Sequence, residues 1–239
     1  MPQEGVELLK HEDILSFEEI TEITKAAVAM GITKVRITGG EPLVRRGIVE
    51  LVRAIGAIDG IADFAMTTNG ILLSEYAQSL ADAGLHRVNI SLDTVNPDRY
   101  KKITQLGSLE HVFNGIKAAQ KAGLAPIKIN CVIGKFSHES DAEAVKEFGR
   151  KNGIAVRIIR QMTFETGSFA IVEGGSGGDC PRCNRLRLSS DGKIRPCLFS
   201  DMYFDVRSLG ACEAIRQALA NKPDAGGLCQ NAKMHRIGG

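Results

Sequence analysis

The chain has 239 residues, of which 24% are charged and 44% hydrophobic, and its formal net charge is +2. That length can bury one barrel-sized core, and the small net charge argues against a nucleic-acid or membrane-surface binder. No stretch approaches the roughly 18 apolar residues of a spanning helix. Because Met1–Ser16 also lacks the basic start and apolar run of a signal peptide, we expect a cytoplasmic protein.

Short β-type runs alternate with amphipathic helical stretches, which is typical of β/α units around a parallel sheet. The first helix is predicted to begin at Ser16, which forms a capping box with Glu19. Asn96-Pro97 is predicted to begin another helix, with proline at its first position. Strands are expected at Lys34–Thr38, Phe64–Thr67, Arg87–Leu92, Ile127–Val132 and Val156–Ile159. The intervening helices are expected at about Ile48–Ile58, Leu73–Ala83, Leu109–Ala122 and Ala142–Asn152.

The last part of the chain follows a different pattern. It contains a Gly-rich stretch from Gly167 to Gly178, a predicted hairpin around Asp191-Gly192 and a predicted helix near Leu209–Ala220. We therefore predict an α/β fold, an incomplete TIM-like β/α barrel over residues 1–165. Residues 166–239 would form a metal-bearing extension within the same compact unit.

The predicted strands alternate between apolar and polar side chains. Val88, Ile90 and Leu92 share one face, whereas Asn89, Ser91 and Asp93 share the other, and Lys34, Arg36, Lys128 and Asn130 follow the same alternation. Helices should cover the apolar faces, so the polar faces would line the barrel interior. Buried cations are costly unless they meet an opposite charge, so a phosphate-rich ligand is expected there. The alternative is an open antiparallel sheet with one wet face, which the regular intervening helices disfavour.

Three cysteines form the most distinctive motif. Cys180, Cys183 and Cys197 are spaced C-x2-C-x13-C, which suits zinc or iron–sulfur ligation. Structural zinc normally takes four ligands, and the recruits would be Cys212 or His235, with Cys229 a further spare thiol. We favour a three-thiolate iron–sulfur cluster with one open iron, and zinc is the alternative. Arg185 and Arg187 would share one face of a following strand and could clamp phosphates.

Longer motifs add a family resemblance. The string Arg36-Ile-Thr-Gly39-Gly40-Glu41-Pro42 resembles the S-adenosylmethionine-binding loop of radical SAM enzymes. With the motifs that follow, the chain resembles the GTP 3′,8-cyclases, which begin molybdenum cofactor synthesis. These motifs are Thr67-Thr68-Asn69-Gly70, Asn89–Asp93, Lys128–Asn130, Cys180–Arg187, Asp191–Lys193 and Ile237-Gly238-Gly239.

The resemblance implies a lyase that converts GTP to the cyclic pyranopterin precursor, using S-adenosylmethionine and two [4Fe–4S] clusters. It implies S-adenosylmethionine contacts from Gly39, Gly40, Glu41, Ser91 and Met162. It implies GTP contacts from Arg36, Thr67, Lys128, Arg185 and Arg187, with Lys34 a weaker candidate. Cys180, Cys183 and Cys197 would hold the auxiliary cluster, and Gly238 and Gly239 would join Arg185 and Arg187 in the active site. The implied partners are GTP and an electron donor such as flavodoxin or ferredoxin, with a possible homodimer and neither nucleic acid nor membrane.

Two features depart from the family pattern. The C-x3-C-x2-C motif that holds the first cluster is missing, through a misplaced start, truncation or natural loss, so we expect this chain to lack radical chemistry by itself. Only 17 residues separate Met162 from Cys180, where cyclases carry several dozen. The alternative functions are a radical SAM enzyme acting on a peptide or another nucleotide, and a non-catalytic zinc- or cluster-bearing binding protein.

Overall fold

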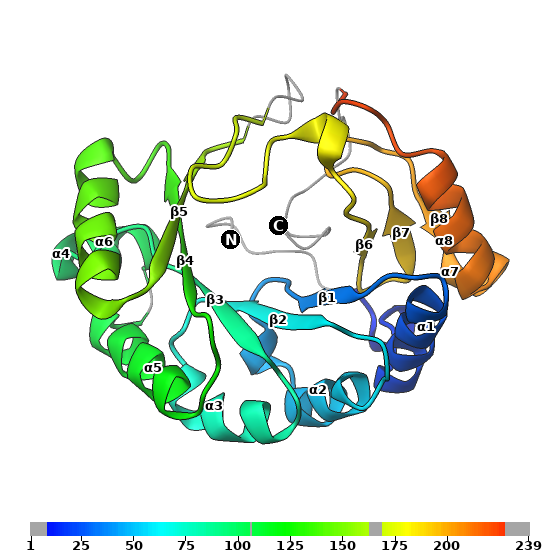
Figure 1. Ribbon diagram of the computed structural model, residues 1–239, viewed down its shortest axis with the longest axis horizontal. Coiled ribbons are helices and arrows are strands. Elements are labelled where there is room, and N and C mark those ends of the chain that lie inside the picture. Colours follow the sequence, from blue (N-terminus) through cyan, green and yellow to red (C-terminus); the bar gives the residue numbers. More distant parts are fainter. Residues whose placement is uncertain (1–8, 106, 163–168, 228–239) are drawn as a thin grey trace.

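A curved parallel sheet forms the centre of the molecule. The computed structural model describes residues 9–105, 107–162 and 169–227. Five strands lie side by side in chain order, and each pairs with its neighbour in parallel. They are β1 (Lys34–Ile37), β2 (Asp63–Thr68), β3 (Arg87–Ser91), β4 (Lys128–Ile133) and β5 (Ala155–Arg160). Figure 1 shows them as an arc, which confirms the predicted incomplete β/α barrel.

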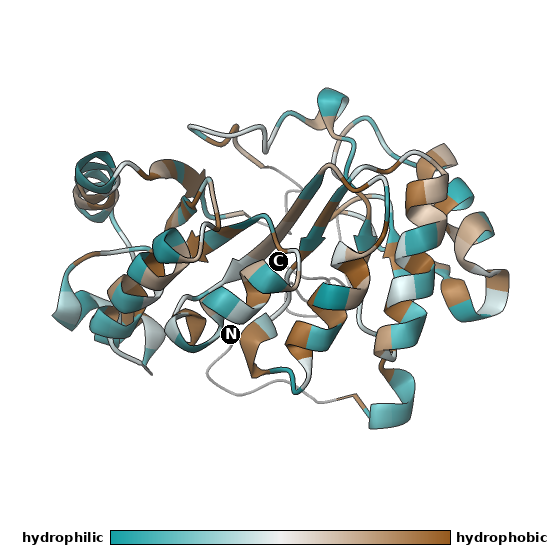
Figure 2. Ribbon diagram, turned by 60° about the horizontal axis from the view of Figure 1, so that its bottom comes forward, coloured by the Kyte–Doolittle hydropathy of each residue, from teal (hydrophilic) through white to brown (hydrophobic). Residues whose placement is uncertain are grey.

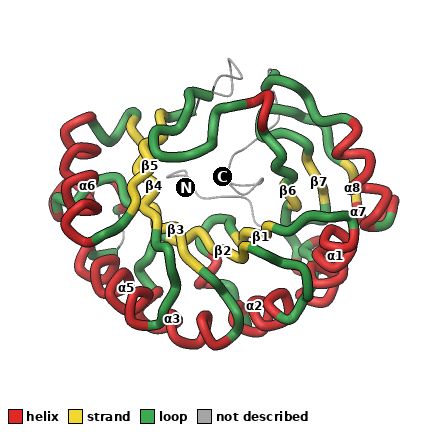
Figure 3. Tube along the Cα trace, in the orientation of Figure 1, coloured by secondary structure: helices red, strands yellow, loops and turns green. Residues whose placement is uncertain are grey.

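Helices cover the outer, convex side of this arc (Figure 3). They are α1 (Phe17–Ala29), α2 (Ile48–Gly56), α3 (Leu73–Asp82), α4 (Pro97–Thr104), α5 (Leu109–Lys121) and α6 (Glu139–Asn152). Short 3₁₀ turns occur at His11–Asp13, Pro42–Val44 and Cys180–Arg182. The C-terminal part adds an antiparallel sheet and two helices: β6 (Arg187–Leu188), β7 (Lys193–Arg195), β8 (Phe204–Asp205), α7 (Val206–Leu209) and α8 (Ala211–Ala220).

Local sequence signals explain most helix boundaries. The predicted capping box at the start of α1 is present, with Ser16 Oγ accepting from the Glu19 amide and Glu19 accepting from the Ser16 amide. Asn96 caps α4, which proved to be a separate helix. The predicted helix near Leu209–Ala220 forms as α8, which begins after Gly210; this glycine adopts φ 78° and ψ 154° and separates α8 from the short helix α7. Of the strand expected just after Cys183, only Arg187–Leu188 forms.

The main core lies between the sheet and its helices. Phe64, Met66, Val88, Ile90 and Ile129 are fully buried on the convex face of the strands. Burying each such side chain contributes about 1.5–3 kcal/mol, so this face fixes the register of the sheet. Figure 2 shows the corresponding mixture of hydrophobic and hydrophilic residues along each helix. The alternate residues of each strand are left to the concave face.

A second, smaller core joins the two ends of the described chain. Leu15 and Ile23, before and within α1, pack with Ile194 of β7 and Ile215 of α8. The C-terminal sheet is therefore held beside β1, next to the concave face (Figure 1). Within the part of the chain that the structure describes, no helix has the length and apolar character needed to cross a membrane.

Candidate functional site

The strand register gathers polar side chains into rows on the concave face. Residues paired across parallel strands point to the same side of the sheet. Thr67, Asn89 and Lys128 form one such row through the β2–β3 and β3–β4 registers. Ser91, Asn130 and Arg157 form the next, towards the carboxyl ends of the strands. Arg36 and Arg87 flank Ala65 in a third row.

Cations crowd one another on this face. Partial desolvation, followed by the charges of Arg87, Arg185 and Arg157, lowers the pKa of Arg36 to about 10, although its side chain still reaches solvent. Burial and the charges of Arg157 and Arg87 lower the pKa of Lys128 in the same way. Such mutual depression means that the positive charges repel each other in the ligand-free protein. An anion bound among them would relieve that repulsion.

Asp63 offsets part of this charge at the amino end of β2. Its carboxylate accepts two hydrogen bonds from Arg87, one from Nε and one from Nη2, each 2.7 Å long. The bidentate ion pair lowers the pKa of Asp63. Arg87 Nη1 in turn donates to Asn89 Oδ1 at 3.1 Å. Arg87 therefore works mainly as a structural cation, and the remaining cations face the concave side without this partner.

Arg157 is a site residue that the sequence reasoning missed. It lies in the same row as Ser91 and Asn130, and its Nε is buried without a hydrogen-bond partner. Asn89 Nδ2 and Asn130 Oδ1 are unsatisfied in the same way. Buried polar groups without partners are rare, so their grouping on one face indicates a place where a polar ligand binds. The alternation of Ala155 and Arg157 with Val156 and Ile158 is the signal that could have identified Arg157.

The glycine loop follows β1 at the carboxyl edge of the sheet. Gly39 has φ 152°, and a Cβ added there would meet no atom within 4 Å, so the backbone faces open space. The Glu41 carboxylate accepts hydrogen bonds from the Leu43 amide, Thr68 Oγ1 and the Asn69 amide, at 3.0, 2.8 and 2.6 Å. Glu41 thus ties the loop to the end of β2. Gly40 lies within this loop, and Ser91 is exposed where β3 ends at the same edge.

The three predicted metal ligands lie on two segments of the C-terminal part. Cys180 and Cys183 flank a 3₁₀ turn, in which the Cys183 amide donates to the Cys180 carbonyl at 3.0 Å. Cys197 Sγ accepts from the Phe199 amide at 3.4 Å. Lys222, a residue that the sequence reasoning did not single out, donates to the carbonyls of Arg185 and Pro196 at 2.8 and 2.7 Å. Lys222 therefore joins the two cysteine-bearing segments.

Electrostatics favour the thiolate form of Cys183. Burial alone would raise the pKa of the Cys183 thiol, but the Arg185 amide and the charges of Lys222, Arg185 and Arg187 lower it overall. Burial and the Arg185 charge lower the pKa of Arg187, which the sulfurs of Cys183 and Cys197 partly counteract. Arg187 therefore lies close to both cysteines. Across residues 9–105, 107–162 and 169–227, however, no three His, Cys, Asp or Glu side chains are arranged as a ready metal site.

The remaining residues named from the sequence lie in different parts of the chain. Met162 is half-buried and packs with Cys197 against Leu198 and Phe199, so it lies beside the cysteine segments. Gly238, Gly239, Cys229 and His235 lie outside the described residues. Cys212 is exposed on α8, and Cys131 is buried in the main core as expected.

The chain is similar to known proteins along nearly its whole length. A model of the radical SAM superfamily matches residues 5–149. The GTP 3′,8-cyclase of Peptoclostridium acidaminophilum is 42% identical over 272 residues, covering 93% of this chain and 84% of that protein. The chain belongs to the GTP 3′,8-cyclase family. The GTP 3′,8-cyclase of Thermodesulfovibrio yellowstonii is 37% identical over 297 residues, covering all of this chain and 92% of that protein.

This chain is shorter than the cyclases that it matches. The alignment with the Thermodesulfovibrio cyclase spans 297 positions although this chain has 239 residues, so that relative carries segments with no counterpart here. Among solved structures, SuiB of Streptococcus suis bound to S-adenosylmethionine has a TM-score of 0.59 at 15% identity, covering 94% of this chain and 64% of that one. Methylornithine synthase has a TM-score of 0.51 at 18% identity, covering 62% of this chain and 44% of that one. These likenesses show the fold.

Proposed function

We propose that this chain binds GTP on the concave face of its sheet and serves its conversion to the cyclic pyranopterin precursor. The observation that carries the proposal is the gathering of Arg36, Lys128 and Arg157 on the concave face, where desolvation and neighbouring arginines lower the pKa of each. Their repulsion is relieved by a polyanion, and a nucleoside triphosphate supplies several negative charges in one ligand. Arg185 and Arg187 extend the same positive region towards the cysteines. Family membership names GTP as the nucleotide.

S-adenosylmethionine is proposed to bind at the carboxyl edge of the same sheet. The open backbone at Gly39, with Gly40 beside it, leaves room for a ligand after β1. Ser91 and Asn130 bring a hydroxyl and an amide to the strand ends nearby. Glu41 would support this loop through its three hydrogen bonds. Superfamily membership is the support for the cofactor itself.

Cys180, Cys183 and Cys197 are proposed to hold an auxiliary iron–sulfur cluster. The donor set fits: all three are free, half-buried thiols, and the surrounding cations lower the pKa of Cys183. A cluster held by three thiolates keeps one iron open to a substrate atom. Loading would require the three sulfurs to converge, since they do not form a ready metal site among the described residues.

Nucleotide binding tests the first proposal. In anaerobic equilibrium dialysis we expect GTP to bind at least about tenfold more tightly than guanosine, because each well-placed charged contact is worth about 1.5–3 kcal/mol. Arg157→Gln should remove most of that preference. Arg53→Gln, an exposed arginine on α2, is the matched control and should leave it unchanged. Equal binding of GTP and guanosine by the unaltered chain would contradict the proposal.

Metal analysis tests the second proposal. After anaerobic reconstitution with iron and sulfide, we expect iron and acid-labile sulfide in the folded protein. Cys183→Ala should reduce both, whereas Cys212→Ala should not, because Cys212 is on a separate, exposed helix face. Bound zinc without sulfide would instead support a structural zinc site.

Two further points follow from the family. An electron donor such as flavodoxin or ferredoxin is proposed as a protein partner, and a homodimer is a possible assembly. A second candidate function is favoured by the short connection of 17 residues between Met162 and Cys180, which leaves less chain to enclose a substrate than cyclases have. A radical SAM enzyme acting on a peptide or another nucleotide would fit it. Competition of GTP with other nucleotides in the same dialysis distinguishes them.

A further inference from the structure

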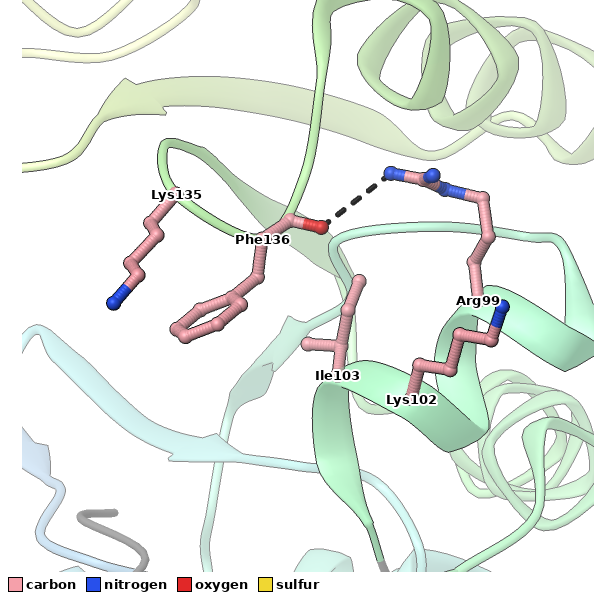
Figure 4. A pocket seen from close by; sticks show the side chains of 5 residues that line it. All are labelled: Arg99, Lys102, Ile103, Lys135 and Phe136. Atoms are coloured by element: carbon pink, nitrogen blue, oxygen red, sulfur yellow. Dashed lines mark hydrogen bonds between the residues drawn. The ribbon is translucent and has the colours of Figure 1, made fainter.

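A basic patch lies away from the concave face, where α4 meets the loop between β4 and α6. Figure 4 shows its lining: Arg99, Lys102 and Ile103 from α4, and Lys135 and Phe136 from the loop. These five residues surround a shallow hollow of about 220 Å³. We call them the α4 patch.

Hydrogen bonds hold the α4 patch in place. Arg99 binds the Asp141 carboxylate through Nε at 2.7 Å and Nη2 at 2.5 Å, and its Nη2 also donates to the Phe136 carbonyl at 3.4 Å. The Lys135 amide donates to Gln161 Oε1 at 2.8 Å. Both lining elements are therefore fixed to α6 and to the end of β5, and the loop presents its side chains from a rigid frame.

The α4 patch combines free positive charge with exposed aromatic surface. The Phe136 side chain is 62% exposed, although phenylalanine is among the residues most often buried. Asp141 neutralises Arg99, but Lys102 and Lys135 make no ion pair within the described residues. Lys135 Nζ lies 5.4 Å from the centre of the Phe136 ring. An exposed aromatic ring beside two lysines without ion pairs can serve as the apolar anchor and charged rim of an interface with an acidic partner.

The α4 patch lies at the same edge of the sheet as the candidate site, which favours a partner that acts on that site. Its loop follows β4 at the carboxyl edge of the sheet, the edge that carries Gly39 and Ser91. Gln161, which anchors the loop, immediately precedes Met162, and Met162 packs against Leu198 and Phe199, as Cys197 does. A protein bound here would lie against the rim of the candidate site while leaving the concave face to a small ligand.

We propose that the α4 patch docks the acidic face of a small electron-carrier protein, with Phe136 as the apolar anchor and Lys102 and Lys135 as the charged rim. The proposal rests on the proposed function, since it supplies the surface for that function's protein partner. Charge complementarity favours an acidic protein. A small anion would need only the cations of the α4 patch. The exposed Phe136 ring therefore favours a protein partner that carries an apolar side chain within its acidic face.

Direct binding tests the proposal without any need for turnover. The probe is purified flavodoxin, and its dissociation constant with the full chain is measured by calorimetry at low and at physiological ionic strength. Reversing both lysines, K102E with K135E, should weaken binding at least about tenfold and flatten its salt dependence. Phe136→Ser should weaken binding about fivefold or more while leaving the salt dependence unchanged. K117E with K121E reverses two exposed lysines on α5 and should change affinity less than about twofold.

The remaining outcomes overturn the proposal. Equal losses of flavodoxin affinity in both double variants would show that only overall charge matters. Unchanged affinity in the α4 patch variants would exclude this surface, as would the absence of any flavodoxin binding by the unaltered chain. GTP dialysis on the same variants separates the two proposals. Retained GTP binding with lost flavodoxin binding supports the docking surface, and absent GTP binding in the unaltered chain counts against the proposed function alone.

Discussion

At the scale of single residues, Lys222 shows how one side chain can organise a site that lies far from it in sequence. Its ammonium group bridges the carbonyls of Arg185 and Pro196, one on each cysteine-bearing segment. We predict that Lys222→Met lowers the free energy of unfolding by about 1.5–3 kcal/mol, because two carbonyls lose a charged donor. It should also speed the modification of Cys180, Cys183 and Cys197 by a thiol reagent.

Urea denaturation and timed thiol labelling measure these two effects. Lys117→Met, which removes an exposed lysine on α5, is the control and should change neither. Unchanged labelling rates in Lys222→Met would mean that the two segments are held together by other contacts.

Gly56 illustrates a residue whose role is to lack a side chain. It ends α2, and a Cβ there would lie 2.5 Å from the Ala83 carbonyl oxygen, which belongs to the backbone after α3. Alanine normally gains up to about 1 kcal/mol over glycine in a helix. We predict the opposite sign here, a loss of about 1–3 kcal/mol from overpacking, measured by urea denaturation of Gly56→Ala. A stabilised variant would show that α2 and α3 can separate at no cost.

At the scale of elements, Asp141 joins three of them. Its carboxylate accepts hydrogen bonds from Arg99 of α4, from Thr94 after β3 and from the His138 amide at the start of α6. Burial alone would raise its pKa, but these partners, with Arg99 foremost, lower it below the ordinary 3.8. Because the folded-state pKa is the lower one, the stabilisation is present above pH 3.8 and is lost as the pH falls through the folded-state value.

We therefore predict that Asp141→Asn costs about 2 kcal/mol at pH 7, less than a fully buried pair because solvent reaches Arg99. The difference between variant and unaltered chain should shrink as the pH falls below 3.8, because Asp141 is protonated first in the unfolded chain and, at a lower pH, in the folded one. Urea denaturation at pH 7 and pH 3 measures it. Asp59→Asn, at an exposed aspartate, is the control. A difference that does not depend on pH would mean that the loss comes from packing.

At the scale of the whole molecule, α1 and α8 make the C-terminal sheet part of the barrel. Ile215 of α8 is 2% exposed and packs with Leu15, Ile23 and Ile194. We predict that the described regions unfold in one cooperative transition, and that Ile215→Ala shifts it by about 2–4 kcal/mol. Circular dichroism and the exposure of the Cys197 thiol should report the same midpoint. Two separate transitions would show that the C-terminal region folds as its own domain.

Much of the fold was open to prediction, because its signals are local. The five strands were expected within a residue or two of their observed bounds, since alternation of apolar and polar side chains persists through each of them. The short helix α7 before Gly210 was not predicted, because four residues are too few to show a helical period. Helix α4 begins at the predicted cap Asn96, although the sequence predicted no end for it.

The sequence by itself determined the chemistry available to this protein: a glycine loop after a strand, three cysteines at ligand spacing, and cations on alternating strand positions. The tertiary structure decided which of these groups lie close together. Only the strand register places Arg157 beside Asn130. Only folding pairs the side chain of Arg87 with Asp63 and brings Lys222 between the cysteine segments. The sequence fixes which side chains are charged, so the charges could be predicted. Which distant residues come close to one another depends on how the two hydrophobic cores pack, so the partners of those charges could not be predicted.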